Sequence, residues 1–216
     1  MAEPAPEAAG PSALVFRHVL QGRLRALFRP GARVLNLGCG AGDDALFLAA
    51  HGVSVLGFDL SPVAVQQARR RALAAGVGSR ARFEVRVSHA LRLEDGVFDG
   101  VFSGLGALER GDLPALGKAL AAALREDAPV LLSVAAPRPA VARYGARAVD
   151  QGQFGPDFAW SRGFGLGIVV PGEPRGGWPS RRPQAFALLA ALESLVREWP
   201  VLRDLGDHLV LEGARR

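Results

Sequence analysis

The feature that most constrains the fold is a short apolar strand that runs directly into a glycine-rich loop. Residues 33–37 read Arg-Val-Leu-Asn-Leu, and Gly38, Gly40 and Gly42 follow at alternate positions. Glycines at a strand-to-helix turn allow a tight backbone bend and let a ligand approach the main chain. A dinucleotide-binding loop needs a further glycine at its sixth position, beside the pyrophosphate. Asp43 occupies that position and would repel a pyrophosphate, so the loop favours a nucleotide-type ligand without one.

A carboxylate follows the next apolar run along the chain. Residues 53–58 are strand-like, and Asp59 comes directly after them. A carboxylate at the carboxyl edge of an α/β sheet can accept hydrogen bonds from both hydroxyls of a bound ribose. The glycine loop and Asp59 together therefore predict a site for an adenosyl ligand that carries no phosphate. The structural alternative is a tight turn followed by an aspartate that caps the next helix.

Strand-like and helical runs alternate along most of the chain. The strands are near-continuous Val and Leu runs, which are typical of strands buried on both faces. Repeated strand–helix units indicate an α/β fold with a parallel sheet covered by helices. The expected strands are residues 33–37, 53–58, 82–87, 98–103, 129–135, 164–170 and 208–211. The expected helices run from Ala13 to before Pro30 and over residues 44–51, 62–75 and 112–125, with a last helix face at Phe186, Leu189, Leu192, Val196 and Trp199.

Length and composition favour one domain. The chain has 216 residues, 49% of them hydrophobic and 22% charged, which suffices for one full core. Residues 1–12 contain three prolines and only acidic charges, so we expect a disordered lead, no secretory signal and a cytoplasmic protein. Residues 13–216 are expected to form a single domain. No membrane partner is expected, because the longest apolar run, residues 128–136, is far below the roughly 20 residues of a membrane-spanning helix.

The charge is basic but spread along the chain. The net charge is +5, the sequence pI is about 10.7, and Lys118 is the only lysine. Arginines occur from Arg17 to Arg216, and the run 69–71 covers most of a helix circumference, as a solvated surface does. A nucleic-acid partner is therefore disfavoured. RNA binding would require arginines that converge on one face and a steep salt dependence.

The sequence indicates neither a disulfide framework nor a metal site. Cys39 is the only cysteine, and it lies inside the glycine loop without a neighbouring histidine. We expect a small packed residue there rather than a nucleophile. His18, His51 and His208 lie in helical or strand contexts and are interpreted as structural. No histidine pair has metal-ligand spacing with Cys or Asp nearby, so no metal is expected.

Four stretches of the chain are similar to successive motifs of one enzyme family. They are VLNLGCGAG, VSVLGFDLSPVAVQQAR, EDGVFDGVFSGLGALE and LREDAPVLLSV. Over residues 30–136 the chain resembles class I S-adenosylmethionine-dependent methyltransferases, and its C-terminal part resembles, more weakly, small bacterial members of unassigned substrate. The resemblance implies a Rossmann-like, doubly wound, seven-stranded sheet, mostly parallel with an antiparallel last strand and helices on both faces. It also implies a cofactor-binding core over residues 30–136 and substrate-side elements over residues 137–216.

The resemblance assigns roles to individual residues. The backbone of residues 38–40 would line the methionine part of S-adenosylmethionine, Asp59 would hold the ribose, and Leu60 would pack on the adenine. Residues 88–90 would lie at the adenine edge, and Ser103 with Gly104 would face the transferable methyl group. The implied cofactor-binding residues are Asn36, Gly38, Cys39, Gly40, Asp59, Leu60, Ser88, His89 and Ser103.

The chain departs from the family pattern at two places. Asn36 stands where the family usually has an acid before the glycine loop, and its amide offers no negative charge to the ammonium of the cofactor. The family usually also has an acid that accepts a hydrogen bond from the adenine amino group. At the corresponding place this chain offers only Ser88 and His89. These departures motivate an alternative hypothesis, a methyltransferase-fold protein that has lost catalysis and acts as a binding module.

Methyl transfer is an in-line displacement in which catalysis is mostly positioning. A general base is needed only where the acceptor must lose a proton, and the candidates are His89 and Glu109, each with a structural alternative. The fourth-strand motif SGLGALE lacks the Asn/Asp-Pro-Pro-aromatic signature that amide- and base-nitrogen methyltransferases share. Aromatic residues that would either sandwich an apolar acceptor or simply pack under a long loop are Tyr144, Phe154, Phe158, Trp160 and Trp178.

The leading hypothesis is therefore an S-adenosylmethionine-dependent methyltransferase that acts on a small molecule, as a monomer or a homodimer. The lapsed enzyme is the first alternative, and RNA methylation, motivated by the basic pI, is the second. An NAD-dependent oxidoreductase is disfavoured by Asp43 and by the lack of an identifiable catalytic group.

Overall fold

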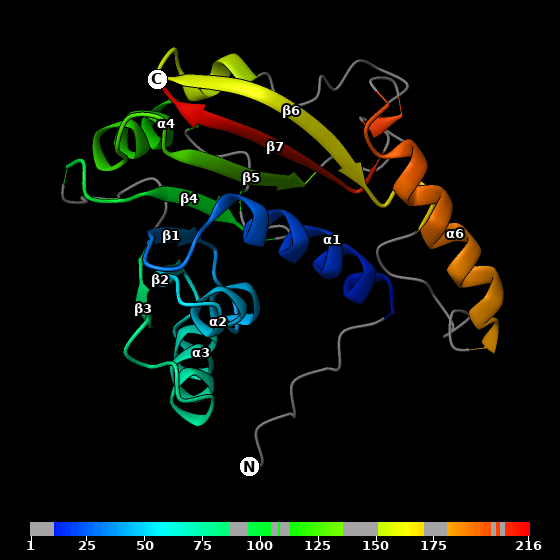
Figure 1. The fold of residues 1–216 in the computed structure, drawn as a ribbon, viewed down its shortest axis with the longest axis horizontal. Helices are drawn as coiled ribbons and strands as arrows, with labels where there is room; N and C mark the ends of the chain where they lie inside the picture. Colours follow the sequence, from blue (N-terminus) through cyan, green and yellow to red (C-terminus); the bar gives the residue numbers. More distant parts are fainter. Residues whose placement is uncertain are drawn as a thin grey trace.

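The computed structural model describes residues 11–86, 95–104, 108, 113–135, 151–170, 181–199, 202–203 and 206–216. These residues build one seven-stranded sheet with the strand order β3-β2-β1-β4-β5-β7-β6 (Figure 1). The strands are β1 (Arg33–Leu37), β2 (Ser54–Asp59), β3 (Ala81–Val85), β4 (Gly100–Ser103), β5 (Pro129–Ala135), β6 (Phe158–Leu166) and β7 (His208–Arg215).

The sheet is mostly parallel. Strands β1 to β5 pair in parallel, whereas β7 runs antiparallel between β5 and β6. The order reverses between β1 and β4, and α/β sheets bind ligands at the carboxyl ends of the strands at such a point. The predicted Rossmann-like sheet with an antiparallel last strand is confirmed.

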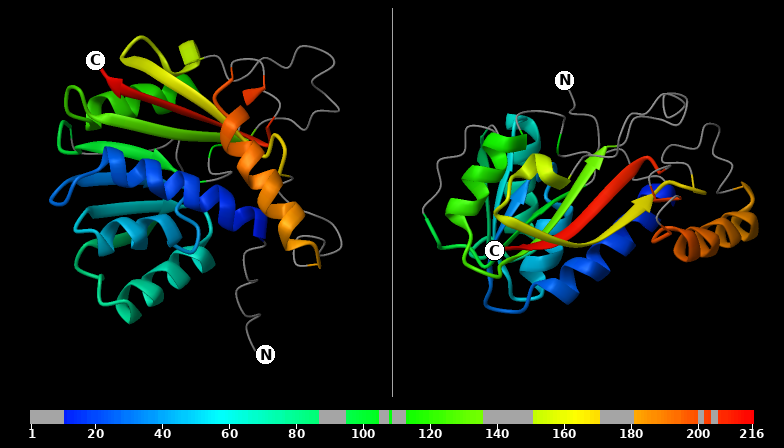
Figure 2. Two further views of the ribbon diagram at one scale, coloured as in Figure 1. Left: turned by 45° about the vertical axis from the view of Figure 1, so that its right-hand side comes forward. Right: turned by 90° about the horizontal axis from the view of Figure 1, so that it is seen from above.

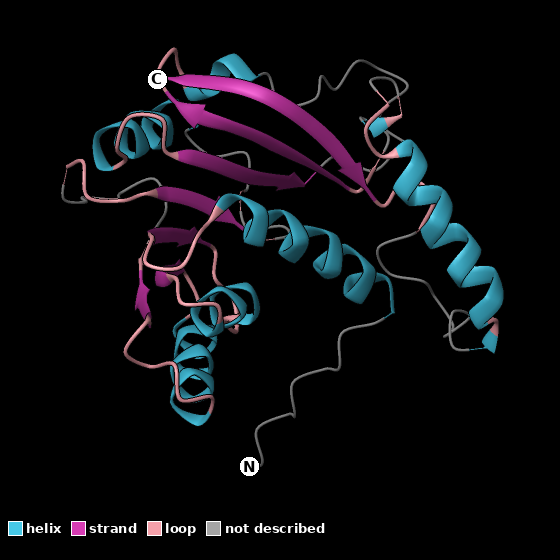
Figure 3. Ribbon diagram, in the orientation of Figure 1, coloured by secondary structure: helices cyan, strands magenta, loops and turns pink. Residues whose placement is uncertain are grey.

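Helices cover both faces of the sheet (Figures 2 and 3). One core cluster joins α1, α2 and α3 to one face, and the other joins α4 and a short 3₁₀ helix, η3, to the opposite face. Successive strand residues alternate between the clusters, as Val34 and Leu35 of β1 do. The helices are α1 (Pro11–Leu27), α2 (Asp43–Ala50), α3 (Pro62–Ala74), α4 (Leu113–Ala123), η3 (Gln151–Phe154) and α6 (Pro183–Val196).

Local sequence signals account for several boundaries. The side chain of Ser61 accepts a hydrogen bond from the Ala64 N–H, with proline at the first helical position, which confirms the predicted start of α3. Strands β1 and β5 have the predicted bounds. Helix α1 begins at Pro11, so the last two residues of the predicted disordered lead, Pro11 and Ser12, are helical. Proline is tolerated in the first turn of a helix, because its missing N–H has no partner there in any case.

The C-terminal third differs most from the sequence prediction. Strand β6 begins at Phe158, six residues before the predicted residue 164, and ends at Leu166 instead of residue 170. Its pairing with β7 shifts register between Trp160 and Arg162, and this irregularity breaks the alternation that a sequence pattern would show. Strand β7 extends to Arg215, four residues beyond its predicted end.

Helix α6 buries only part of its predicted apolar face. Phe186 and Leu189 pack against the first core cluster. Leu192 and Trp199 are 40% and 59% exposed, so this part of the predicted face is uncovered by the described residues. None of the described helices is long and apolar enough to cross a membrane.

Candidate functional site

The glycine loop joins β1 to α2 at the carboxyl edge of the sheet. Gly38, Gly40 and Gly42 all have positive φ, at 61°, 51° and 86°, a left-handed backbone that favours glycine. The Cys39 N–H donates to the Phe58 carbonyl oxygen at 2.8 Å, so the loop is fastened to the end of β2. The predicted strand–loop–helix geometry is therefore present.

Asp59 contacts the glycine loop directly. Its Oδ2 accepts a hydrogen bond from the Gly40 N–H at 2.8 Å, and its Oδ1 accepts one from the Ser61 N–H at 2.9 Å. Each carboxylate oxygen retains acceptor capacity, because an ionised carboxylate offers about four lone-pair sites. The structure thus brings the two sequence-predicted features together, the loop and the acid after the second strand.

The glycines differ in the space beside them. A Cβ on Gly40 would meet nothing within 4 Å, whereas one on Gly57 of β2 would lie 2.7 Å from Cδ1 of Phe83. Gly57 is therefore required by packing, and Gly40 borders open space. Next to Asp59, the side chain of Leu60 is 62% exposed, so an apolar surface is available beside the carboxylate, at the place predicted for the adenine.

The Asn36 side chain of β1 is buried. It is 1% exposed, and its Oδ1 has no hydrogen-bond partner among the residues that the structure describes. A buried acceptor without a partner is unusual in a folded protein and calls for an explanation, such as a ligand that donates to it.

The hydroxyl of Ser103 does not face a cleft, contrary to the side-chain role suggested by the sequence. Ser103 is fully buried, and its hydroxyl accepts a hydrogen bond from the Ser133 N–H at 2.7 Å. The same hydroxyl lies 3.3 Å from the Ser133 carbonyl oxygen, to which it donates. The side chain thus links β4 to β5 and is not available to a ligand.

Cys39 and two histidines have the structural roles expected. Burial, followed by the charge of Asp59, raises the pKa of the Cys39 thiol to about 12, so it is not a thiolate at neutral pH. The His51 Nδ1 lies 2.7 Å from the Phe47 carbonyl oxygen. Burial lowers the pKa of His208, which therefore stays neutral at pH 7. Within the described ranges, no three His, Cys, Asp or Glu side chains gather as metal ligands.

Several predicted residues lie outside the described residues. These are Ser88, His89 and Glu109, together with Tyr144 and Trp178.

The other three candidate aromatics belong to the core. Phe154 and Phe158 are 1% and 4% exposed, and the Trp160 ring packs 5.4 Å and 5.9 Å from theirs, centroid to centroid. The prediction that these three side chains sandwich a methyl acceptor is therefore wrong. They pack together where β6 meets η3 and the face of the sheet that α4 covers.

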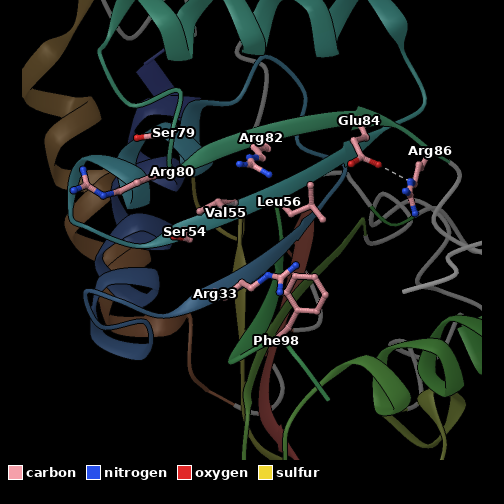
Figure 4. Close-up of a pocket in the computed structure, with 10 residues that line it drawn as sticks. All are labelled: Arg33, Ser54, Val55, Leu56, Ser79, Arg80, Arg82, Glu84, Arg86 and Phe98. Atoms are coloured by element: carbon pink, nitrogen blue, oxygen red, sulfur yellow. Dashed lines mark ion pairs between the residues drawn. The ribbon is translucent and has the colours of Figure 1, made fainter. Parts of the chain in front are cut away.

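A separate hollow of about 480 Å³ lies over the other end of that sheet face, across β1, β2 and β3 (Figure 4). Arg86 forms an ion pair with Glu84 at 2.7 Å, and the guanidinium of Arg33 lies 4.7 Å from the Phe98 ring centroid. Arg80 and Arg82 also border it, so the surface is predominantly basic. The hollow does not include the glycine loop or Asp59 among its described lining residues.

Comparison with known proteins connects this geometry to a family. Residues 34–127 match the family model described as a methyltransferase domain. The chain is 52% identical over 42 residues to the S-adenosyl-L-methionine-dependent Diels-Alderase iccD of Talaromyces variabilis, a match over 19% of this chain and 14% of that protein. It is 38% identical over 76 residues to the 27-O-demethylrifamycin SV methyltransferase of Amycolatopsis mediterranei (strain S699), over 35% and 28% of the two chains.

The fold is shared over a longer range. The solved structure of the [4+2]-cyclase SpnF matches with a TM-score of 0.66 and 19% identity, over 98% of this chain and 85% of that one. The matched segment thus spans less than a third of the two curated relatives, while the architecture extends over nearly the whole chain. The methyltransferase-domain match, which covers less than half of the chain, and the order of the seven strands both support the predicted resemblance to class I S-adenosylmethionine-dependent methyltransferases.

Proposed function

We propose that this protein binds S-adenosylmethionine at the glycine loop and transfers its methyl group to a small-molecule acceptor. The observation that carries the proposal is the hydrogen bond between Asp59 and the Gly40 N–H beside open space. It places a carboxylate with spare acceptor capacity next to a backbone that a ligand can approach closely.

The residues present fit this cofactor. Asp59 would accept from the ribose hydroxyls, and the exposed Leu60 would cover the adenine. The backbone of residues 38–40 would line the amino-acid part, and the buried Asn36 Oδ1 offers an acceptor that no described residue uses. When bound, S-adenosylmethionine supplies a methyl group activated by the positive sulfur. The contribution of the protein is to bind and orient, since in-line displacement depends mostly on positioning.

The small-molecule acceptor is supported by the relatives. The names of the rifamycin methyltransferase and of the Diels-Alderase both point to low-molecular-weight products. His89 and Glu109 remain the candidates for a general base if the acceptor must lose a proton, and a cytoplasmic monomer or homodimer remains the expected state.

The proposal predicts saturable binding of S-adenosylmethionine in the micromolar range, measured by titration calorimetry. Asp59→Ala should weaken binding at least about 10-fold, because a hydrogen bond to a charged group contributes roughly 1.5–3 kcal/mol. Asp157→Ala, which removes an exposed carboxylate far from the loop in sequence, is the matched control and should bind as the wild type does. Absence of wild-type binding, or equal affinities for Asp59→Ala and wild type, would refute the proposal.

A second candidate function is cofactor binding without methyl transfer. Two observations favour it: the neutral Asn36 before the loop, and the names of the Diels-Alderase and the [4+2]-cyclase, which describe ring formation. Incubation with methyl-labelled S-adenosylmethionine and a metabolite mixture separates the two. Label transferred to any acceptor supports the methyltransferase, whereas tight binding without turnover supports the alternative.

A further inference from the structure

A second carboxylate approaches the glycine loop from α2. Asp44 lies in the first turn of this helix, and its Oδ1 accepts a hydrogen bond from the Gln21 side chain of α1 at 3.1 Å. Its Oδ2 lies near Gly104. A Cβ atom added to Gly104 would be 3.5 Å from this oxygen and 3.7 Å from the carbonyl oxygen of Gly38. A carboxylate oxygen and a carbonyl oxygen therefore border the same point, between the ends of β1 and β4.

The orphaned acceptor of Asn36 belongs to the same side of the sheet. Asn36 lies two residues after Val34 on β1, so both side chains point to the face that α1 and α2 cover. Asp44 belongs to α2, on that same face. Three oxygen acceptors, from Asn36, Asp44 and Gly38, are thus offered from one side of the sheet near its carboxyl edge.

The negative charge of Asp44 is less well balanced by nearby positive charges than that of Asp43. Asp43 is paired with Arg17 at 3.0 Å and with Arg71 at 2.6 Å. For Asp44, burial raises the pKa, the Gln21 hydrogen bond and the charge of Arg17 lower it, and Asp43 raises it again. The net direction is upward, so the charged carboxylate is poorly stabilised. A ligand cation at Oδ2 would remove that deficit.

We propose that Asp44, oriented by Gln21, binds the charged amino group of S-adenosylmethionine and so supplies the negative charge that Asn36 does not. The inference rests on the proposed function and refines it. Acceptors without a net charge, such as the Asn36 amide and the Gly38 carbonyl, would complete the shell around the amino group. The neutral asparagine is then compatible with cofactor binding, because its charge is replaced from the next helix.

The test compares two probes by calorimetry. One is S-adenosylhomocysteine, and the other is its deaminated analogue, which keeps the carboxylate but has no amino group. Asp44→Asn should weaken binding of the first roughly 10- to 100-fold, the effect of one hydrogen bond to a charged group. It should change binding of the second less than about twofold, because that probe has no amino group for Asp44 to bind.

Matched variants make the result specific. Asp43→Asn removes an equal charge one residue away and should leave the preference for the amino-bearing probe unchanged. Asn36→Asp, added to Asp44→Asn, should restore most of that preference by returning a charge to the other side of the amino group. Because the readout is a ratio of two affinities, partial loss of stability in one variant does not imitate the effect.

The outcomes separate the two proposals. If wild type binds neither probe, the proposed function fails. If wild type binds S-adenosylhomocysteine but Asp44→Asn weakens both probes equally or neither, the role of Asp44 is overturned and cofactor binding stands. An equal loss of preference in Asp43→Asn would also overturn it, since a general change of charge would then explain the result.

Discussion

Gly40 and Gly57 respond differently to the addition of one methyl group. In Gly57→Ala the new Cβ would lie 2.7 Å from Phe83 and 2.9 Å from Cys39, which overpacks the core and should cost about 1–3 kcal/mol. In Gly40→Ala the Cβ enters open space, and only the backbone strain at φ 51° remains, about 1–2 kcal/mol. That methyl group, however, stands where the proposed ligand approaches.

We therefore predict a split between stability and binding. Denaturant unfolding should show a lower free energy of unfolding for both variants. Calorimetry should show that Gly40→Ala weakens the affinity for S-adenosylmethionine at least about 10-fold. Gly57→Ala, once folded, should bind within a few-fold of wild type. If Gly40→Ala bound S-adenosylmethionine as tightly as the wild type, the ligand would not contact the backbone at Gly40.

At the level of elements, Glu193 of α6 fastens the chain that follows β6. It is 1% exposed, and its carboxylate accepts four backbone N–H groups. Gly167 and Ile168 donate to Oε1 at 2.7 Å and 3.1 Å, and Val169 and Val170 donate to Oε2 at 2.7 Å and 3.1 Å. This one side chain therefore satisfies four backbone donors in the residues that directly follow β6.

Glu193→Gln should destabilise the protein by at least about 2 kcal/mol, because the amide nitrogen of glutamine cannot accept from two of those N–H groups. The measurement is equilibrium unfolding in guanidinium. Glu198→Gln is the control, since Glu198 is about half exposed and lies 3.9 Å from Arg162, and its change should stay within about 0.5 kcal/mol. A Glu193→Gln variant as stable as this control would refute the assigned role.

The elements also show what a sequence can predict. Strands β1 and β5 were predictable to the residue, because strands buried on both faces are continuous apolar runs bounded by turns. The contact of Asp59 with the glycine loop followed from topology, since parallel strands end at one edge. Strand β6 and the role of Glu193 were not predictable, because a register shift hides the strand pattern and the four partners of Glu193 lie 23 to 26 residues away.

Candidate site residues were harder to judge than strands. A serine at the end of a strand has the same local pattern whether its hydroxyl faces a ligand or the next strand, as that of Ser103 does. The sequence pattern predicts only that Asp44 begins a helix. Its significance depends on Gln21 and Gly104, which approach it from other elements. Contacts of this kind follow from packing and leave no periodic signal.

At the scale of the whole molecule, a charge pair joins the first helix to the last strand. Arg23 of α1 donates through Nε to Oε2 of Glu212 in β7 at 3.0 Å and through Nη2 to Oε1 of the same carboxylate at 2.6 Å. Glu212 is 9% exposed, and a bidentate arginine–carboxylate pair of this kind fixes orientation as well as distance. Helix α1, whose apolar side chains share one core cluster with residues of β1, β5, β6 and β7, therefore holds the β1–β4 half, with its glycine loop, to the half that contains β5, β6 and β7.

The positions of the arginines bear on the remaining alternative, RNA methylation, because RNA binding requires arginines that converge on one face. The sequence suggested no convergence of charge, yet the hollow over β1–β3 is bordered by Arg33, Arg80, Arg82 and Arg86 (Figure 4). Four phosphate contacts to single-stranded RNA would give a salt slope of at most about −3, on the scale of roughly −0.7 per phosphate. The small-molecule proposal does not require such contacts.

The small-molecule proposal predicts that RNA binds this protein only in the non-specific range. The Kd, measured by fluorescence anisotropy, should lie above about 10⁻⁶ M near physiological salt. The same proposal also predicts that the paired changes Arg80→Ser and Arg82→Ser leave the affinity for S-adenosylmethionine within about twofold, because neither side chain borders the glycine loop. A submicromolar RNA complex with a steep salt dependence that is lost in this double variant would show the opposite. The basic hollow would then be a phosphate-binding surface, and an RNA would replace the small molecule as acceptor.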